Sequence, residues 1–501
     1  MSNKQNYETH LASSYNGRDT LGLTSTITNA VDQRKVNFIY EDVENTMSEK
    51  TTVYLTKRPG VTINASTYGS SAQAAYVINS PIAGGDLWVA STLGNDVRMS
   101  NQASTTTIFS SGAGYAPEFI DRTVLNGTPN VVLQSRVPGA YTHRADYMIS
   151  IGAATQITDT DFTGLVVRGK MEPMDGFMFV LDGNMRIYNS DINTLANWSA
   201  ISYLSLSQTF GDAVSLARFK NKILAFTDEG SEAFYNAGNA SGSPLSRIAG
   251  SESDVGMVRM GDGTNGSTNI YAKATGGLYF VGMRNAWQRG GTTDFSLGLY
   301  AYNEEGFRKV STFGVDKILA EAKATGTIQC VVSVPFFGHV AVAIGIDTRA
   351  AATQRWLMYF PKWKEWFEWN STVFTPMNYN GNFIGVSPNQ HRLYSFDTAN
   401  VWQDDSTNYN VISQFKLPLN GPGRKKMSWC SVIGDTSRSA TALSVAFSDD
   451  DYQTFSPDRT IDMTSPTKLL WRCGMFNERA VRLSYSGAQP LRLEKFIARI
   501  E

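Results

Sequence analysis

The sequence contains few charged residues and few cysteines. Only 18% of its 501 residues are charged, and 44 basic residues against 45 acidic ones leave a net charge of −1 at pH 7. Without a basic excess, counterion release cannot provide tight binding to nucleic acid. Cys330, Cys430 and Cys473 are far apart and odd in number, which favours reduced thiols over a disulfide framework.

Segments that would enter a membrane and motifs that would hold a cofactor are also lacking. No apolar run approaches the ~18 residues that span a bilayer, and the N-terminus has no apolar signal-peptide stretch, so we expect no membrane insertion. The histidines form no metal-ligand spacing and no nucleophile–base pair. Gly261, Gly263 and Gly266 match G-x-G-x-x-G, but strand-type residues follow them, which indicates a loop. We therefore expect no catalytic residues, cofactor or metal.

Helical periodicity is nearly absent, whereas β-hairpins recur. Phe177–Asp191 reads FMFVLDGNMRIYNSD, two apolar runs joined by an Asp-Gly-Asn turn, which is typical of a hairpin. Similar units are found at Asp86–Met99, Ile223–Tyr235, Val340–Tyr359 and Phe383–Phe396, with weaker ones at Val131–Leu133 and at Leu278–Val281 with Leu299–Tyr302.

These hairpins follow one another at roughly 40–50 residues, the period of β-propeller blades. The sequence therefore predicts an all-β protein with a β-propeller of six or seven blades over residues 76–400. The alternative is one large β-sandwich, but such a domain rarely exceeds ~250 residues. Residues 1–75 and 401–501 lack the period, and we expect them to build a second, β-rich platform domain together.

Two segments have alternative interpretations. The first, Phe360–Asn370, has the sequence FPKWKEWFEWN, and its aromatic residues would form a platform for a sugar or base. Alternatively, it is a strand whose tryptophans pack between blades while Lys and Glu face solvent, and we favour this packing interpretation. Ser448, Asp450, Thr454 and Phe455 fit the Asp-box S-x-D-x-G-x-T-[WF], with Tyr452 in place of glycine. An Asp-box is a hairpin turn fixed by local hydrogen bonds, so it reports geometry and not catalysis.

The two ends of the chain together resemble one family. After the Asp-box, Trp471, Arg472, Gly474, Arg479 and Arg482 occupy the places of a Trp-Arg, Gly and Arg pattern that closes the tail nozzle, or packaged-DNA stabilisation, proteins of short-tailed bacteriophages. VNFIYEDVEN and TKRPGV, within residues 36–61, are similar to the opening of that family. The terminal matches cover about a third of the chain.

This resemblance implies a structural protein of the virion tail, synthesised in the host cytoplasm. It implies a ring of six subunits below the portal and adaptor, which retains packaged DNA, conducts it at ejection without specific binding, and carries tail spikes or fibres. Arg424, Lys425, Lys426, Trp471, Arg472, Arg479 and Arg482 are the candidate adaptor-docking residues. The competing hypothesis is a glycan-binding or sialidase-like β-propeller, based on the Asp-box and the tryptophans.

Overall fold

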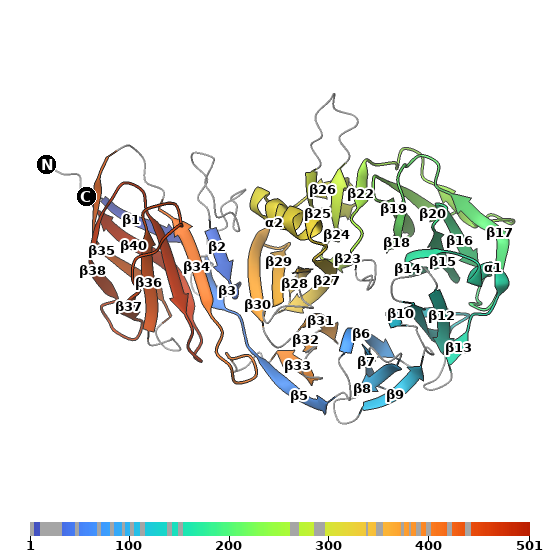
Figure 1. The fold of residues 1–501 in the computed structure, drawn as a ribbon, viewed down its shortest axis with the longest axis horizontal. Helices are drawn as coiled ribbons and strands as arrows, with labels where there is room; N and C mark the ends of the chain where they lie inside the picture. Colours follow the sequence, from blue (N-terminus) through green and yellow to red (C-terminus); the bar gives the residue numbers. More distant parts are fainter. Residues whose placement is uncertain are drawn as a thin grey trace.

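The structure is a computed structural model. It describes residues 5–10, 33–45, 50–67, 72–80, 85–92, 96–100, 105–110, 116–137, 143–148, 154–260, 270–284, 296–336, 339–346, 354–371, 375–379, 382–386, 392–396, 402–417, 423–435 and 442–501. The G-x-G-x-x-G segment lies outside these residues. Figure 1 shows a ring of sheets on the right and a separate pair of sheets on the left, where both ends of the chain lie.

Seven antiparallel sheets follow one another around the ring (Figure 1). The first contains β6 (Ala72–Ser80), β7 (Gly85–Thr92), β8 (Asp96–Ser100) and β9 (Thr105–Ser110). The second contains β10 (Ala116–Leu125), β11 (Thr128–Arg136), β12 (His143–Met148) and β13 (Ala154–Gln156). The third contains β14 (Val167–Met174), β15 (Phe177–Asp182), β16 (Arg186–Ser190) and β17 (Trp198–Ser205), and is preceded by a short helix, α1 (Thr160–Thr163).

The other four sheets complete the circle. The fourth contains β18 (Ala213–Phe219), β19 (Lys222–Thr227), β20 (Ser231–Asn236) and β21 (Leu245–Arg247). The fifth contains β22 (Val255–Met257), β23 (Tyr271–Ala274), β24 (Gly277–Arg284), β25 (Ser296–Asn303) and β26 (Gly306–Lys309). The sixth contains β27 (Ile328–Phe336), β28 (His339–Ile346), β29 (Gln354–Phe360) and β30 (Glu365–Ser371), and the seventh contains β31 (Thr375–Tyr379), β32 (Asn382–Val386), β33 (Arg392–Phe396) and β5 (Val61–Thr67).

This arrangement confirms the predicted all-β class and the propeller. The central two strands of each blade are the hairpins found in the sequence; Leu278 pairs with Tyr302 and Val281 with Leu299, for example. The predicted Asp-Gly-Asn turn is also present, because Asp182 accepts a hydrogen bond from the Asn184 backbone N–H at 3.1 Å. Such alternating runs and turns are local signals, and local chemistry is sufficient to form them.

The seventh blade is closed by a strand from the N-terminal segment. β5 pairs with β33, and Val61 lies opposite Phe396. β5 falls within residues 1–75, which the sequence analysis assigned to the platform domain. The sheet pairing instead joins it to the propeller, so that the first and last strands of the ring are held together by hydrogen bonds between segments far apart in the sequence.

The second domain is a β-sandwich made of strands from both ends of the chain. One sheet contains β1 (Gln5–His10), β3 (Phe38–Asn45), β4 (Lys50–Lys57), β35 (Lys425–Gly434), β38 (Leu469–Phe476) and β40 (Arg492–Ile500). The facing strands are β2 (Gln33–Val36), β34 (Val411–Lys416), β36 (Ala442–Ser448), β37 (Arg459–Asp462) and β39 (Ala480–Tyr485). Buried side chains from both sheets, including Leu55, Phe415 and Phe496, form a common core.

Helices α1 and α2 (Phe313–Ala324) were not predicted, and α2 is the longer of the two. α2 lies between β26 and β27, and its Val315, Leu319 and Ala322 are buried. These residues recur at helical spacing, four and three apart, which is the pattern of an amphipathic helix. Neither α2 nor any other helix in the described residues is both long and apolar enough to cross a membrane.

Candidate docking face and domain junction

The candidate docking residues separate into an exposed group and a structural group. Arg424 and Lys426 are exposed, and Lys425 is half-buried, at the start of β35. Trp471 is 57% exposed on β38, which is the edge strand of its sheet. β38 pairs with β35, and this register places Lys426 opposite Met475, which is 53% exposed. Basic and large apolar side chains therefore share one sheet edge, named here the β35–β38 edge.

A bulge shapes this edge. The register shifts where Met427 pairs with Gly474 and Trp429 pairs with Trp471, so Arg472 and Cys473 together face a single residue of β35. Arg472 has a φ of 58° and Gly474 a φ of 88°. Bulges with positive φ bend a strand and interrupt its ladder. The Arg459 guanidinium on β37 fixes the bulge, because it donates to the backbone oxygens of Trp471 and Arg472.

Arg479, directly before β39, and Arg482, on β39, are not part of this edge. Arg479 is 4% exposed and forms two hydrogen bonds of 2.7 Å with the Asp449 carboxylate. Its guanidinium also lies 4.2 Å from the Phe476 ring centroid. A buried, bidentate arginine of this kind holds its own fold together and has no donor fork left for a partner. Arg482 is half-buried, 3.1 Å from Asp458 and over the Phe455 ring.

The Asp-box hairpin has the predicted local hydrogen bonds. Asp450 accepts from the Ser448 hydroxyl at 2.7 Å and from the Thr454 backbone N–H at 2.9 Å. The Thr454 and Ser448 donors lower the pKa of Asp450 to about 2. The carboxylate is fully engaged in its own turn, so the Asp-box is a structural element, as predicted.

The aromatic segment Phe360–Asn370 differs from the single strand that was predicted. Residues 361–364 form a turn, with Lys364 at a φ of 56°, and β30 begins only at Glu365. Trp366, Phe367 and Trp369 are buried, which agrees with the packing interpretation. Trp366 packs in the propeller core, whereas Phe367 and Trp369 pack in the core that the blade shares with the sandwich.

The glutamates of this strand do not face solvent, which corrects the prediction. Glu365 is 4% exposed and Glu368 is 2% exposed. Glu365 lies 3.8 Å from the Lys35 ammonium, and Glu368 accepts from Arg34 at 3.1 Å and from Arg355 at 3.2 Å. β2 continues the sheet at this edge, with one parallel bridge between Val36 and Glu368, so both carboxylates meet basic side chains of β2 instead of water.

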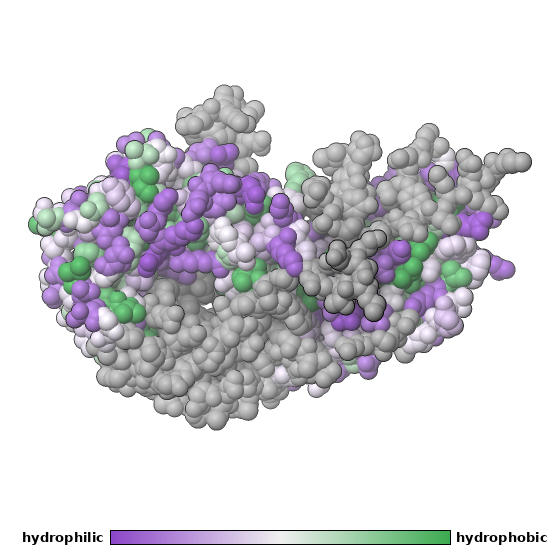
Figure 2. All heavy atoms as spheres, turned by 180° about the vertical axis from the view of Figure 1, so that it is seen from behind, coloured by the Kyte–Doolittle hydropathy of each residue, from purple (hydrophilic) through white to green (hydrophobic). Residues whose placement is uncertain are grey.

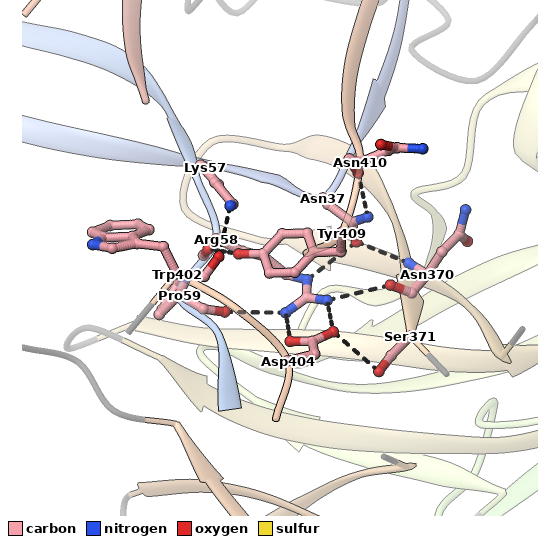
Figure 3. A network of polar contacts seen from close by, with 10 residues as sticks. All are labelled: Asn37, Lys57, Arg58, Pro59, Asn370, Ser371, Trp402, Asp404, Tyr409 and Asn410. Atoms are coloured by element: carbon pink, nitrogen blue, oxygen red, sulfur yellow. Dashed lines mark hydrogen bonds and ion pairs between the residues drawn. The ribbon is translucent and has the colours of Figure 1, made fainter. Parts of the chain in front are cut away.

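The centre of the domain junction is a buried arginine (Figure 3). Arg58 is fully buried and forms an ion pair with Asp404 at 2.6 Å, and it also donates to the Asn370 backbone oxygen at 3.2 Å. Its guanidinium stacks 4.0 Å from the Tyr409 ring centroid. Asn37, at a φ of 58°, accepts from Arg58 Nε at 3.1 Å and from the Asn370 N–H.

The same junction holds a buried lysine. Lys57 Nζ donates to the backbone oxygens of Trp402 at 2.6 Å and Gly487 at 2.7 Å (Figure 3 shows the first of these). Burial, and then the neighbouring Arg58, lower the pKa of Lys57 to about 7, against the opposing effect of Asp404. Gly60 follows in a turn where a Cβ atom would lie 2.0 Å from the Gln403 oxygen, so only glycine fits.

Sequence reasoning missed this junction. The sequence analysis used TKRPGV and VNFIYEDVEN only as evidence of a family resemblance. The structure shows that these two segments supply Lys57, Arg58 and Asn37 of the junction. A basic pair directly before Pro-Gly, flanked by apolar residues, is a weak signal of buried charge. In the described part of the chain, no cluster of three His, Cys, Asp or Glu side chains has the arrangement of a metal site.

Comparison with known proteins gives similarity of fold alone. No family model matches the sequence, and no curated protein does. Similar solved structures include an ancestral GH74 enzyme (TM-score 0.41, 11% identity, covering 72% of this chain and 51% of that chain). BamB from Moraxella catarrhalis (0.37, 8%, 74% and 98%) and YCF48 from Cyanidioschyzon merolae (0.38, 11%, 68% and 100%) are others. The chain thus spans about half the length of the GH74 enzyme, and these likenesses assign no activity.

Proposed function

We propose that this chain is a structural protein of a short-tailed phage virion, the tail nozzle or hub. In this proposal about six copies form a ring below the portal and adaptor, close the DNA channel, retain the packaged genome and conduct it at ejection. The protein acts as a wall and a conduit and not as an enzyme. Spikes or fibres attach to the outside of the ring.

The observation that carries this proposal is the construction of the sandwich from both ends of the chain. Strands β3 and β4 of the N-terminal segment and strands β34 to β40 of the C-terminal segment share one core, and the propeller is inserted between them. The terminal motifs on which the family resemblance rests come together in this domain and at its junction with the propeller. A domain of this kind is suited to dock on a ring while the propeller extends the wall.

Inside the propeller, side chains of two non-adjacent blades meet. Lys170 and Glu172 on β14 are buried, and Glu172 accepts a hydrogen bond from the Tyr271 hydroxyl on β23, two blades away. Lys170 Nζ lies 4.4 Å from the Tyr271 ring centroid. Because these contacts occupy the space between non-adjacent blades, DNA would pass through the bore between subunits and not along a propeller axis.

The surface is also suited to a passive conduit. A net charge of −1 gives no basis for strong phosphate binding, which would hinder movement of the cargo. On the face in Figure 2, the described hydrophobic side chains lie in small patches among polar ones. Interfaces of modest apolar content gain strength from multivalent docking on a preformed ring.

The deciding experiment is electron microscopy and native mass spectrometry of the purified chain, alone and with a portal–adaptor complex. We expect mainly monomer alone, and a ring with a central channel when the complex is added. The triple variant Arg424→Ser, Lys425→Ser, Lys426→Ser should dock more slowly and with a weaker dependence on salt, since rim charges chiefly set the encounter rate. Lys317→Ser, which removes an exposed basic charge from helix α2 of the propeller, is the matched control.

A second assay separates this proposal from the glycan-binding alternative. Fluorescence anisotropy with labelled duplex DNA over a salt series should give negligible binding at physiological salt, and sialoside and polysaccharide hydrolysis assays should give no turnover. Sub-micromolar, sequence-dependent DNA binding would contradict a passive conduit. Reproducible glycan turnover would replace the nozzle with a glycan-active propeller.

A further inference from the structure

The fold brings together two cysteines that the sequence analysis treated as distant. Cys430 on β35 and Cys473 on β38 are 43 residues apart in the chain, and their sulfurs are 3.8 Å apart. Cys430 is fully buried, and Cys473 is 6% exposed. Cys473 lies in the bulge beside Gly474, on the edge strand, whereas Cys430 lies one strand further in. Both thiols are therefore buried, and Cys473 is the one on the edge strand.

The two thiols have different electrostatic environments. The hydrogen bond with Cys430, together with Arg459 and Arg479, lowers the pKa of Cys473. Both arginines are fixed close to the bulge, because Arg479 donates to the Cys473 backbone oxygen and Arg459 donates to that of Arg472 at 3.1 Å. The hydrogen bond with Cys473 and burial raise the pKa of Cys430. A cysteine whose pKa is lowered, with a second thiol 3.8 Å away, is the arrangement of a peroxide-sensitive pair.

We propose that Cys430 and Cys473 form a reversible, peroxide-sensitive disulfide that cross-links β35 to β38. The Cys473 thiolate attacks one oxygen of hydrogen peroxide, the O–O bond breaks, and with one proton Cys473 sulfenic acid and water are produced. The Cys430 thiol then attacks the sulfenic sulfur, an S–S bond forms, and a second water leaves. Two thiols are thus oxidised by two electrons while one peroxide is reduced to two waters.

The cross-link requires only a small movement. A disulfide has an S–S distance of about 2 Å, so the sulfurs must approach by less than the width of one atom. The bond would join the edge strand that carries Trp471 and Met475 to its inner neighbour. This inference goes beyond the proposed function and does not depend on it, because it concerns chemistry within one chain.

The test uses the folded full chain, purified with reductant. After reductant removal, a small excess of hydrogen peroxide is added and then destroyed with catalase. The protein is denatured, its thiols are alkylated, and intact and peptide masses are measured. We expect two of three thiols to be lost, one linked peptide containing Cys430 and Cys473, and alkylated Cys330. The midpoint of thermal unfolding should rise by several degrees and return after dithiothreitol treatment, since a cross-link restricts the unfolded chain.

Three variants make the result specific. Cys330→Ser is the matched control and should still form the bond. Cys430→Ser should leave a Cys473 sulfenic acid that dimedone traps, whereas Cys473→Ser should leave Cys430 unreactive. Alkylation of all three thiols after peroxide treatment of the folded wild-type chain would overturn the proposal. Dimedone labelling on Cys330 alone, or disulfides only between molecules, would also overturn it.

Discussion

Lys57 and Arg58 are adjacent and both buried, but their charges are compensated differently. Arg58 has a carboxylate partner in Asp404, at 2.6 Å. Among the described residues, the partners of Lys57 are two backbone oxygens and two aromatic rings, those of Tyr409 at 4.3 Å and Tyr485 at 5.4 Å. Burial of a charge without a counterion favours the neutral form. This is why the pKa of Lys57 is lowered to about 7.

The lowered pKa makes the contribution of Lys57 dependent on pH. Its usual pKa is 10.5, so between about 7 and 10.5 the unfolded chain holds the proton more tightly than the folded chain. Stability from Lys57 therefore rises with pH across this window and is lost as pH falls towards 7.

The variant Lys57→Met tests this at residue scale. At pH 9 it should lower the free energy of unfolding by about 1–3 kcal/mol, because two buried carbonyl groups lose their donor. Between pH 9 and pH 7 the difference from wild type should shrink by about 1–2 kcal/mol, since only the wild type has to bury a charge at lower pH. Urea unfolding followed by tryptophan fluorescence measures both values. An unchanged difference would mean that Lys57 stays charged in the folded chain.

At the scale of single elements, the Asp-box hairpin combines favourable hydrogen bonds with backbone strain. The Tyr452 N–H donates to the Ser448 hydroxyl at 2.9 Å, but Tyr452 has a φ of 68° where the motif has glycine. A positive φ is energetically unfavourable for residues with a Cβ atom, whereas glycine adopts it without this cost in free energy.

Two substitutions at this position separate strain from side-chain contacts. Tyr452→Gly and Tyr452→Ala both remove the ring, but only the glycine variant also removes the Cβ atom. We expect the glycine variant to be more stable than the alanine variant by about 1 kcal/mol in urea unfolding. Equal stability of the two variants, or a more stable alanine variant, would contradict the strain.

At the scale of the whole molecule, the propeller and the sandwich are joined by continuous sheet and buried charge. β30 contributes to both cores, and β2 extends its sheet into the sandwich. Val61 N donates to Gln403 O at 3.1 Å, and Asp405 N donates to Val61 O at 2.9 Å, so the closing strand β5 is also tied to the Asp404 segment. The two domains are therefore expected to move as one unit.

The variant Asp404→Ala tests this connection. It should lower the free energy of unfolding by about 3–5 kcal/mol, because Arg58 would remain buried without its partner. The rates of amide hydrogen exchange at Val61 and Asp405 should also increase in this variant. The double variant Arg58→Met, Asp404→Leu removes both charges and should be more stable than Asp404→Ala. A single variant as stable as wild type would show that the ion pair does not hold the domains together.

The sequence by itself determined the repeating unit. Alternating apolar residues around a turn such as Asp182-Gly183-Asn184 depend on neighbours a few residues away, and for this reason the hairpins, the propeller and the Asp-box geometry could be predicted. Helix α2 could have been predicted in the same way, because the helical spacing of Val315, Leu319 and Ala322 is visible in the sequence. These elements follow from backbone propensities and from the period of apolar side chains.

Only the tertiary structure decided which of these surfaces would meet. Glu365 and Glu368 lie on a strand that would face water in an isolated blade, but the sandwich covers it and buries both. Arg58 contacts Asp404, which is 346 residues away in the chain, and Cys430 contacts Cys473, which is 43 residues away. Arg479 is buried in the sandwich, where it binds Asp449. Alternation along a strand reports that two faces differ, but it cannot report what will cover each face, because that depends on strands that arrive from elsewhere in the chain.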